Sequence, residues 1–234
     1  MAKAGILYGV GVGPGDPKLM TIRAGEVIRA ADVLTYPVNR AGKSRARAIA
    51  ATLIARGARE LPFHLPMKPE RGPARAAYDT AATTISGHLE AGRNVVYLCV
   101  GDPFFYGSFM YLAARLKDAH KIEVVPGVTS PSACAAQTLV SLGGRNDVLS
   151  IVPATLDADA LKSALANADT AAIIKVGRHF AKVRDVLRAL GLEGRALVLE
   201  SVTGEGERIT TLEEVGENDT PYFSTILLRR GELS

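Results

Sequence analysis

The sequence predicts an α/β protein with two α/β domains, each a sheet with helices packed on it. Its 234 residues suit either one large domain or two of about 110–120 residues. Short apolar runs alternate with longer segments of helical spacing, a pattern typical of parallel sheets covered by helices. Apolar residues make up 47% of the chain and charged residues 22%, so the chain can bury a core and is not disordered.

The first half of the chain predicts a mainly parallel sheet. The run at 94–100 is apolar at nearly every position, which indicates a strand buried on both faces. Pro37 is expected to stop the second strand. Residues 61–73 are rich in proline and are expected to form a loop. The other strands are predicted at 6–11, 33–36 and 122–125, and the helices at 18–31, 44–56, 74–90 and 106–117.

The second half repeats this alternation but ends differently. After residue 200 the helical pattern stops, and the segments 208–211 and 222–229 are expected to pair as an antiparallel hairpin at the edge of a mixed sheet. We place the boundary between domains 1–123 and 124–234. The preceding elements are predicted as strands at 148–152, 171–176 and 196–200 and helices at 132–142, 158–166 and 180–190.

Two glycine-containing loops resemble phosphate-binding motifs but lack the required spacing. In the run from Gly9 to Asp16, the last glycine of the dinucleotide pattern G-x-G-x-x-G is replaced by Pro14 or Asp16, depending on the register. The run Gly42-Lys43-Ser44 lacks the glycine that a Walker A loop carries five residues earlier, where Pro37 stands. A nucleotide-binding function based on either loop is therefore disfavoured.

Two other loops follow predicted strands and carry candidate ligand-binding groups. Asp102 follows Gly101 at a carboxyl strand end, where open α/β sheets bind ligands. A carboxylate there suits an ammonium, a sulfonium or ribose hydroxyls and repels phosphate, and the aromatic residues 104–106 suit the wall of an adenine site. The alternative is a helix-capping aspartate. Thr129 and Ser130 place hydroxyls at the start of a predicted helix.

The charge of the chain is uneven, although its net value is only +4. Residues 40–75 contain nine basic and two acidic side chains, a local excess of +7, so the rest of the chain carries −3. This excess suits an anionic ligand or an ordinary solvated helix face. Aromatic residues make up only 6% and tryptophan is absent, which argues against nucleic-acid binding.

The cysteines and the apolar runs indicate in which cellular compartment the protein is expected. Cys99 and Cys134 form neither a disulfide framework nor a metal motif, so we expect a reducing environment and no metal site. No apolar run approaches the ~18–20 residues of a membrane helix, and the first residues do not resemble a signal peptide. We therefore expect a cytoplasmic protein without a membrane partner.

Three segments together resemble one known family. Residues 10–34 (VGVGPGDPKLMTIRAGEVIRAADVL), 101–107 (GDPFFYG) and 124–133 (VVPGVTSPSA) are similar in order and spacing to the tetrapyrrole methylases. The resemblance covers most of the chain, and the last 60 residues match mainly in layout. It implies two α/β domains with a ligand cleft between them, S-adenosylmethionine as methyl donor with S-adenosylhomocysteine as product, a polycarboxylate tetrapyrrole substrate, and a homodimer.

The resemblance also implies site residues. The cofactor-binding set is Pro14, Val100, Gly101, Asp102, Phe105, Thr129, Ser130, Val176 and Val202. A sulfonium is already an activated methyl donor, so we assign no catalytic residue and expect positioning to supply most of the rate. For the substrate we expect Arg40, Arg45 and Arg71 to bind carboxylates as bidentate forks, with Tyr36 and His64 as candidates for handling protons.

Within the family, three segments favour a methylase of corrin precursors. These are residues 35–37 (TYP), 65–67 (LPM) and 101–112. Uroporphyrinogen methyltransferases are expected to carry Asp-Arg near residues 37–38, where this chain has Pro-Val. The alternatives left open are another tetrapyrrole, such as a cobalt-containing precursor or uroporphyrinogen III, an RNA ribose, and, from a different class, a nucleotide-binding protein.

Overall fold

The computed structural model describes residues 4–65, 71–216 and 223–231, with only the backbone of Arg71. The chain forms two compact units, residues 1–129 and 130–234. The expected boundary between residues 123 and 124 falls inside strand β5 (Ile122–Val125), which pairs with β1 (Leu7–Gly11) of the first sheet. The division therefore lies a few residues beyond the expected position, after β5 is complete.

The first unit is built on the parallel sheet that the sequence predicts. Its strand order is β3-β2-β4-β1-β5, and every described pairing is parallel. The central strand β4 (Val95–Cys99) is buried at all positions, as its apolar sequence predicts. The other strands are β2 (Val33–Val38) and β3 (Arg59–His64).

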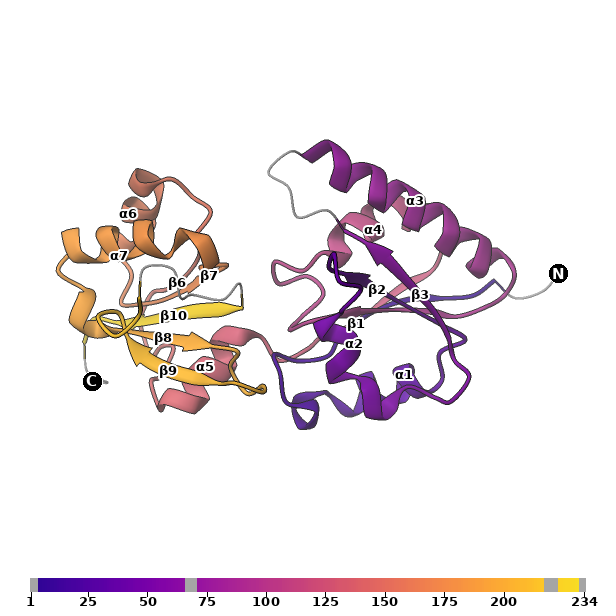
Figure 1. Ribbon diagram of the computed structural model, residues 1–234, viewed down its shortest axis with the longest axis horizontal. Helices are drawn as coiled ribbons and strands as arrows, with labels where there is room; N and C mark the ends of the chain where they lie inside the picture. The colour runs from indigo at the N-terminus through magenta and orange to yellow at the C-terminus, as the bar shows by residue number, and fades with distance from the viewer. Residues whose placement is uncertain (1–3, 66–70, 217–222, 232–234) are drawn as a thin grey trace. The chain divides into compact units, whose positions relative to one another are not determined.

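Helices cover both faces of this sheet (Figure 1). On one face lie α1 (Ile22–Arg29) and α2 (Arg45–Ile49), together with the 3-10 turns η1 (Pro17–Leu19) and η2 (Ala51–Leu53). The opposite face carries α3 (Arg71–Glu90) and α4 (Phe109–Leu116). Each face has its own apolar core, the first around Ile28 and Leu98, the second around Tyr97 and Phe109.

The predicted loop at 61–73 is wrong for its first residues, because β3 runs to His64. Pro62 donates no hydrogen bond, but β3 is an edge strand that pairs only with β2, and an edge strand tolerates proline. The expected stop at Pro37 is also too early, since β2 continues to Val38. Its pairing with β4 covers only residues 33–35, so Pro37 interrupts no bond on that side.

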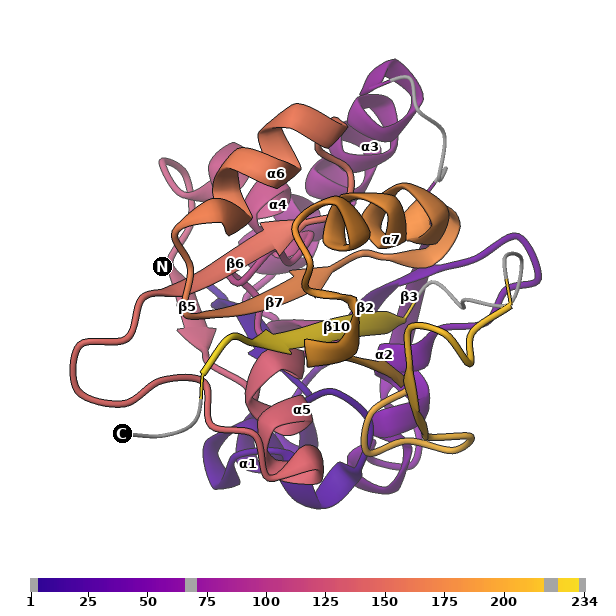
Figure 2. The ribbon, with the colours of Figure 1, turned by 90° about the vertical axis from the view of Figure 1, so that its left-hand side faces the viewer.

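The second unit holds a mixed sheet of order β6-β7-β10-β8-β9. Helices α6 (Ala158–Ala166) and α7 (Phe180–Ala189) cover one face and α5 (Ser130–Thr138) the other (Figure 2). The strands are β6 (Leu149–Pro153), β7 (Thr170–Ile174), β8 (Ala196–Glu200), β9 (Arg208–Thr211) and β10 (Ser224–Arg229), and the short turns are η3 (Gly177–His179) and η4 (Glu193–Arg195).

The mixed sheet is confirmed, but the predicted edge hairpin is wrong. β10 does not pair with β9; it lies in the middle of the sheet, antiparallel to both β7 and β8. Five of its six residues are buried, so it needs neighbours on both sides. β9 alternates between partly buried and exposed residues, which suits the edge position beside β8.

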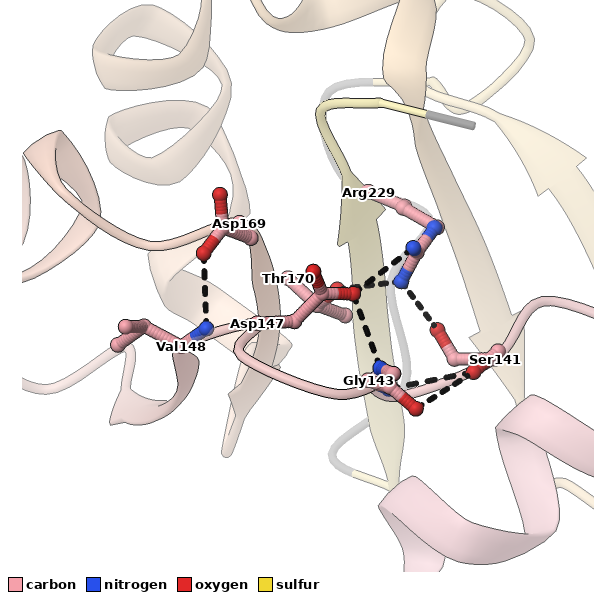
Figure 3. Close-up of polar contacts among 8 residues, drawn as sticks. Ser141, Gly143, Asp147, Val148, Asp169, Thr170 and Arg229 are labelled. Atoms are coloured by element: carbon pink, nitrogen blue, oxygen red, sulfur yellow. Dashed lines mark hydrogen bonds and ion pairs between the residues drawn. The ribbon is translucent and has the colours of Figure 1, made fainter. Parts of the chain in front are cut away.

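An arginine at the end of β10 holds the connection from α5 to β6 (Figure 3). Arg229 donates from Nη1 to the Ser141 carbonyl at 3.2 Å and to Thr170 Oγ1 at 3.1 Å, and from Nη2 to Asp147 Oδ2 at 2.9 Å. The same Asp147 oxygen accepts the Gly144 amide at 3.0 Å. These contacts, first the Gly144 amide and then Arg229, lower the pKa of Asp147.

Candidate functional site

The candidate site lies at the carboxyl ends of the first sheet, which we call the carboxyl edge. β1 leads to α1 on one face and its neighbour β4 leads to α4 on the other (Figure 1). Loops that leave adjacent strands toward opposite faces mark a switch point, where open α/β sheets bind ligands. The loops after β1 and β4 carry Pro14 and the run 100–105, so the switch point collects most of the predicted cofactor residues.

Four glycines bring three loop backbones into contact at this point, and we call them the glycine junction: Gly11, Gly13, Gly101 and Gly127. Gly13 and Gly101 each donate to the other's carbonyl, at 3.3 and 2.8 Å, and both have a positive φ that favours glycine. A Cβ on Gly11 would lie 2.6 Å from the Gly101 oxygen and 2.7 Å from Gly127 Cα. Any side chain there would separate the loops.

The carboxylate of Asp102 is bound by backbone amides. Oδ1 accepts from Phe104 and Phe105 at 2.8 and 2.9 Å, and Oδ2 accepts from Gly127 at 3.0 Å. The first two bonds form a local turn. They do not make Asp102 the helix cap considered as the alternative, because α4 begins only at Phe109 and its N-cap is Ser108. The third bond joins the loop after β4 to the loop after β5. Sequence reasoning missed Gly127 as a partner, although its place after a strand in the run VVPGVT is a signal for a close backbone approach.

Aromatic side chains next to the junction form a partly exposed apolar surface. Phe104 is 53% exposed and rests on Phe109, with ring centroids 5.9 Å apart. Tyr106 is 41% exposed, and its ring lies 5.5 Å from that of the half-buried Phe105. Phe109 in turn packs on the fully buried Tyr97 at 5.5 Å. The exposed ring of Phe104 is therefore supported by the core of the unit through Phe109.

Arg45 lies beside the loop after β1. Its guanidinium donates from Nη2 to the Pro14 carbonyl at 3.2 Å, and burial lowers its pKa. Pro14 itself is buried. This contact connects a residue expected to bind substrate with one expected near the cofactor. Thr129 ends the first unit and Ser130 begins α5, where its Oγ accepts from Thr225 at 3.3 Å.

Tyr36 belongs to a charged network within the first unit. Its hydroxyl donates to Glu60, and Arg47 donates to both oxygens of the same carboxylate, at 3.0 and 2.9 Å. Burial first, and then Glu60, raise the pKa of Tyr36, while Arg47 lowers that of Glu60. Sequence reasoning missed Glu60 because no strand was predicted at 59–64, and the expected loop began at residue 61. A buried phenol with a raised pKa is a poor base at neutral pH.

The remaining residues that the sequence predicts to bind substrate are His64, Arg40 and Arg71. His64 ends β3 opposite Val38, and Arg40 follows β2, so both lie at the carboxyl edge and are exposed. Arg71 begins α3, but its side chain lies outside the described residues. Pro66 and Met67 of the LPM run also lie outside the described part of the chain.

The basic excess of residues 40–75 does not gather in one place. Arg40 and Lys43 are exposed at the carboxyl edge, whereas Arg56 and Arg59 are exposed at the opposite edge, where β3 begins. Arg47 is paired with Glu60. The local charge of +7 therefore overstates the field that one ligand would meet.

The Gly42-Lys43-Ser44 segment forms a closed turn. Asn39 Oδ1 accepts from the amides of Ala41 and Lys43, both at 3.0 Å, and the Asn39 carbonyl accepts from Gly42 at 2.9 Å. The amides that would hold a phosphate in a P-loop are thus used inside the turn. This geometry agrees with the rejection of a nucleotide site there.

Two predicted cofactor residues lie in the second unit. Val176 is fully buried in the core of that unit, between β7 and η3. Val202 is 5% exposed and follows β8. The Val176 side chain therefore packs in the core of this unit, and the Val202 side chain is buried. Among the described residues, no cluster of three His, Cys, Asp or Glu side chains could hold a metal ion. The described helices include none long and apolar enough to cross a membrane.

Curated relatives match nearly the whole chain. Cobalamin biosynthesis protein CobIJ of Mycobacterium tuberculosis is 40% identical, over 99% of this chain but only 47% of that protein. The chain thus spans about half the length of this relative. Precorrin-2 C(20)-methyltransferase of a Sinorhizobium species is 38% identical, over 96% of this chain and 95% of the relative. Cobalt-precorrin-2 C(20)-methyltransferase of Salmonella typhimurium is 31% identical over 97% of each.

Solved structures share the fold. The cobalt precorrin-4 methyltransferase CbiF covers 96% of this chain with a TM-score of 0.73 and 24% identity. Uroporphyrin-III C-methyltransferase of Thermus thermophilus, solved with S-adenosylhomocysteine, covers 96% with a TM-score of 0.70 and 24% identity. The family model described as tetrapyrrole (corrin/porphyrin) methylases matches residues 6–216. These matches confirm the resemblance that the three sequence segments suggested, and two of those segments include the loops at the switch point. The chain belongs to the tetrapyrrole methylase family.

Proposed function

We propose that this protein transfers a methyl group from S-adenosylmethionine to C20 of precorrin-2, a step of cobalamin biosynthesis. The observation that carries the proposal is the match to the Sinorhizobium precorrin-2 C(20)-methyltransferase, which extends over 95% of that relative's length. The segments at 35–37 and 101–112 support the same branch of the family. The missing Asp-Arg pair near residue 37 argues against uroporphyrinogen III as substrate.

The carboxyl edge of the first unit suits a sulfonium nucleoside better than a dinucleotide. The amides of Gly13 and Gly101 each donate to the other residue's carbonyl, so these two amides are not available to a pyrophosphate. The exposed ring of Phe104 beside it offers an apolar surface for an adenine. S-adenosylmethionine supplies, when bound, a methyl group already activated by the positive sulfur.

The protein's own residues then have to bind and orient the methyl donor and the tetrapyrrole, and to exclude water from the site. Holding a carbon nucleophile in line with the methyl group supplies most of the rate, so the site needs no strong base. We propose that Arg40 binds a substrate carboxylate at the carboxyl edge, where its guanidinium is exposed. Arg45, Arg71 and His64 remain candidates for the same surface.

We further propose that the protein works as a homodimer in the cytoplasm, on this small molecule and without nucleic acid. Its two cysteines are free and buried, which suits a reducing compartment. The described basic residues of the segment 40–75 are divided between two edges of the sheet, which argues against a continuous positive stripe of the kind a nucleic-acid backbone needs.

Calorimetry and substrate competition test this proposal. S-adenosylhomocysteine should bind, whereas ATP and NAD should not. With the methyl donor present, metal-free precorrin-2, cobalt-precorrin-2 and uroporphyrinogen III should be offered together, and precorrin-2 should be methylated first. Preference for the cobalt form would place this protein beside its Salmonella relative. Binding of ATP without S-adenosylhomocysteine would support the nucleotide-binding alternative instead.

A further inference from the structure

We propose that Asp102 is a positioning residue that locks the loops after β4 and β5 together and so shapes the binding site for the methyl donor. The inference rests on the proposed function for the identity of that donor. It assigns to the carboxylate a role through Gly127, instead of a direct bond to the donor.

The strand order explains why such a lock is needed. β4 and β5 are not neighbours, because β1 lies between them. The loops after β4 and β5 meet only beyond the end of β1, where Gly11 has no side chain to keep them apart. A Cβ on Gly127 would overlap the Gly101 carbonyl oxygen, so the two loops touch through their backbones. No ladder of strand hydrogen bonds joins them at this point.

Asp102 provides the connection that the sheet lacks. One carboxylate oxygen accepts two amides of its own loop, Phe104 and Phe105, and the other accepts the Gly127 amide from the loop after β5. These bonds use three of the roughly four acceptor positions of a carboxylate. The charge favours bonds from backbone amides, and each is stronger than a bond between neutral groups. The carboxylate thereby holds the backbone at Gly127, two residues before the first unit ends at Thr129.

Replacement of Asp102 by asparagine separates the two connections. An asparagine has one acceptor oxygen, and its amide group can only donate. It can therefore serve the turn at Phe104 and Phe105, but its NH₂ group then faces the Gly127 amide and that bond is lost. In Asp102→Asn without ligand, we expect the Gly127 amide to exchange its hydrogen roughly ten- to a hundredfold faster, while the Phe104 amide stays protected.

The kinetic consequence should fall on the methyl donor. We expect the KM for S-adenosylmethionine and the Kd of S-adenosylhomocysteine to rise about tenfold, with kcat and the KM for the tetrapyrrole within about twofold. Asp147→Asn is the matched control, because Asp147 also accepts a glycine amide, but in the second unit (Figure 3). It should lower thermal stability without changing the KM for the donor.

The outcomes distinguish the alternatives. If affinity for S-adenosylhomocysteine falls while exchange at Gly127 stays as in the parent, Asp102 binds the donor directly and the proposal is overturned. Unchanged exchange and unchanged affinity overturn it as well. Should the variant fail to fold, NMR of the labelled parent protein decides, because the bond predicts a scalar coupling from the Gly127 amide to the Asp102 carboxylate carbon. The exchange and coupling data need no substrate, so they stand even if C20 methylation fails.

Discussion

The Tyr36 hydroxyl donates to Glu60, and this carboxylate also receives the guanidinium of Arg47. Tyr36 is 6% exposed, and burial raises its pKa further above the ordinary value of a phenol, which is already protonated at neutral pH. We therefore expect Tyr36→Phe to lower the free energy of unfolding by about 1 kcal/mol through the lost hydrogen bond. The pH dependence of kcat should not change. A shifted pH profile would instead show that the phenol handles a proton during the reaction.

His88 predicts a pH dependence of stability. Its Nδ1 accepts from Arg93 Nε at 2.8 Å, and burial, followed by the charges of Arg93 and Arg59, lowers its pKa below 6.5. The unfolded chain therefore binds this proton more readily than the folded protein. The stabilisation is complete above about pH 6.5 and is lost as the pH falls through the lower folded value.

The His88→Gln variant tests this linkage. A glutamine carbonyl can still accept from Arg93 but does not titrate. Urea unfolding between about pH 7.5 and pH 5 should show a weaker loss of stability on acidification in the variant than in the parent. Equal slopes for the two proteins would mean that His88 has the same pKa in the folded and unfolded states.

Arg40 and Arg56 form a matched pair for substrate binding. Both are exposed, but Arg40 lies at the carboxyl edge and Arg56 lies near the opposite edge, before β3. Arg40→Ala should raise the KM for the tetrapyrrole about five- to tenfold, and Arg40→Lys should restore it in part, since lysine keeps the charge without the planar fork. Arg56→Ala should have no effect. If both alanine variants behave alike, Arg40 is only a solvated cation.

At the scale of the elements, opposite effects on stability are expected for alanine at Gly11 of the glycine junction and at Gly87 of α3. Gly11→Ala places a methyl group 2.6 Å from the Gly101 oxygen, and neither backbone can move without disturbing a strand end, so we expect a loss of about 2–3 kcal/mol. Gly87 lies within α3 with no atom within 4 Å of its would-be Cβ. Gly87→Ala should stabilise the protein by about 0.5–1 kcal/mol. Denaturant unfolding measures both, and a harmless Gly11→Ala would contradict the close approach.

The sequence predicted some elements better than others for physical reasons. β4 was predictable because its apolar residues leave no doubt that both faces are buried. β3 was missed because proline usually breaks a strand, and only its edge position makes Pro62 acceptable. The place of β10 could not be derived from adjacency, since it is inserted between β7 and β8 and does not pair with β9.

The candidate site was predictable in part. Glycines after strands correctly indicated where loop backbones approach each other, and the carboxyl edge follows from the parallel order. The partner of Asp102 was not predictable, because Gly127 is 25 residues away and meets it across β1. The charge count also failed to show that Arg47 is neutralised by Glu60, a contact that depends on β3.

At the scale of the whole molecule, each unit has its own sheet and its own core. The core of the second unit, around Val176, Phe180 and Ile226, shares no residue with the two cores of the first. The family match runs through both units, from residue 6 to residue 216. The proposed function therefore belongs to the complete pair of units, although the switch point and the Asp102 lock lie within the first.

The position of the transferred methyl group tests the central claim most directly. The protein should be incubated with precorrin-2 and S-adenosylmethionine carrying a ¹³C-labelled methyl group, and the product examined by NMR and mass spectrometry. We expect one added methyl group, with the label bonded to C20, and one S-adenosylhomocysteine released for each methyl group transferred. A label at another carbon, or methylation of uroporphyrinogen III but not of precorrin-2, would contradict it.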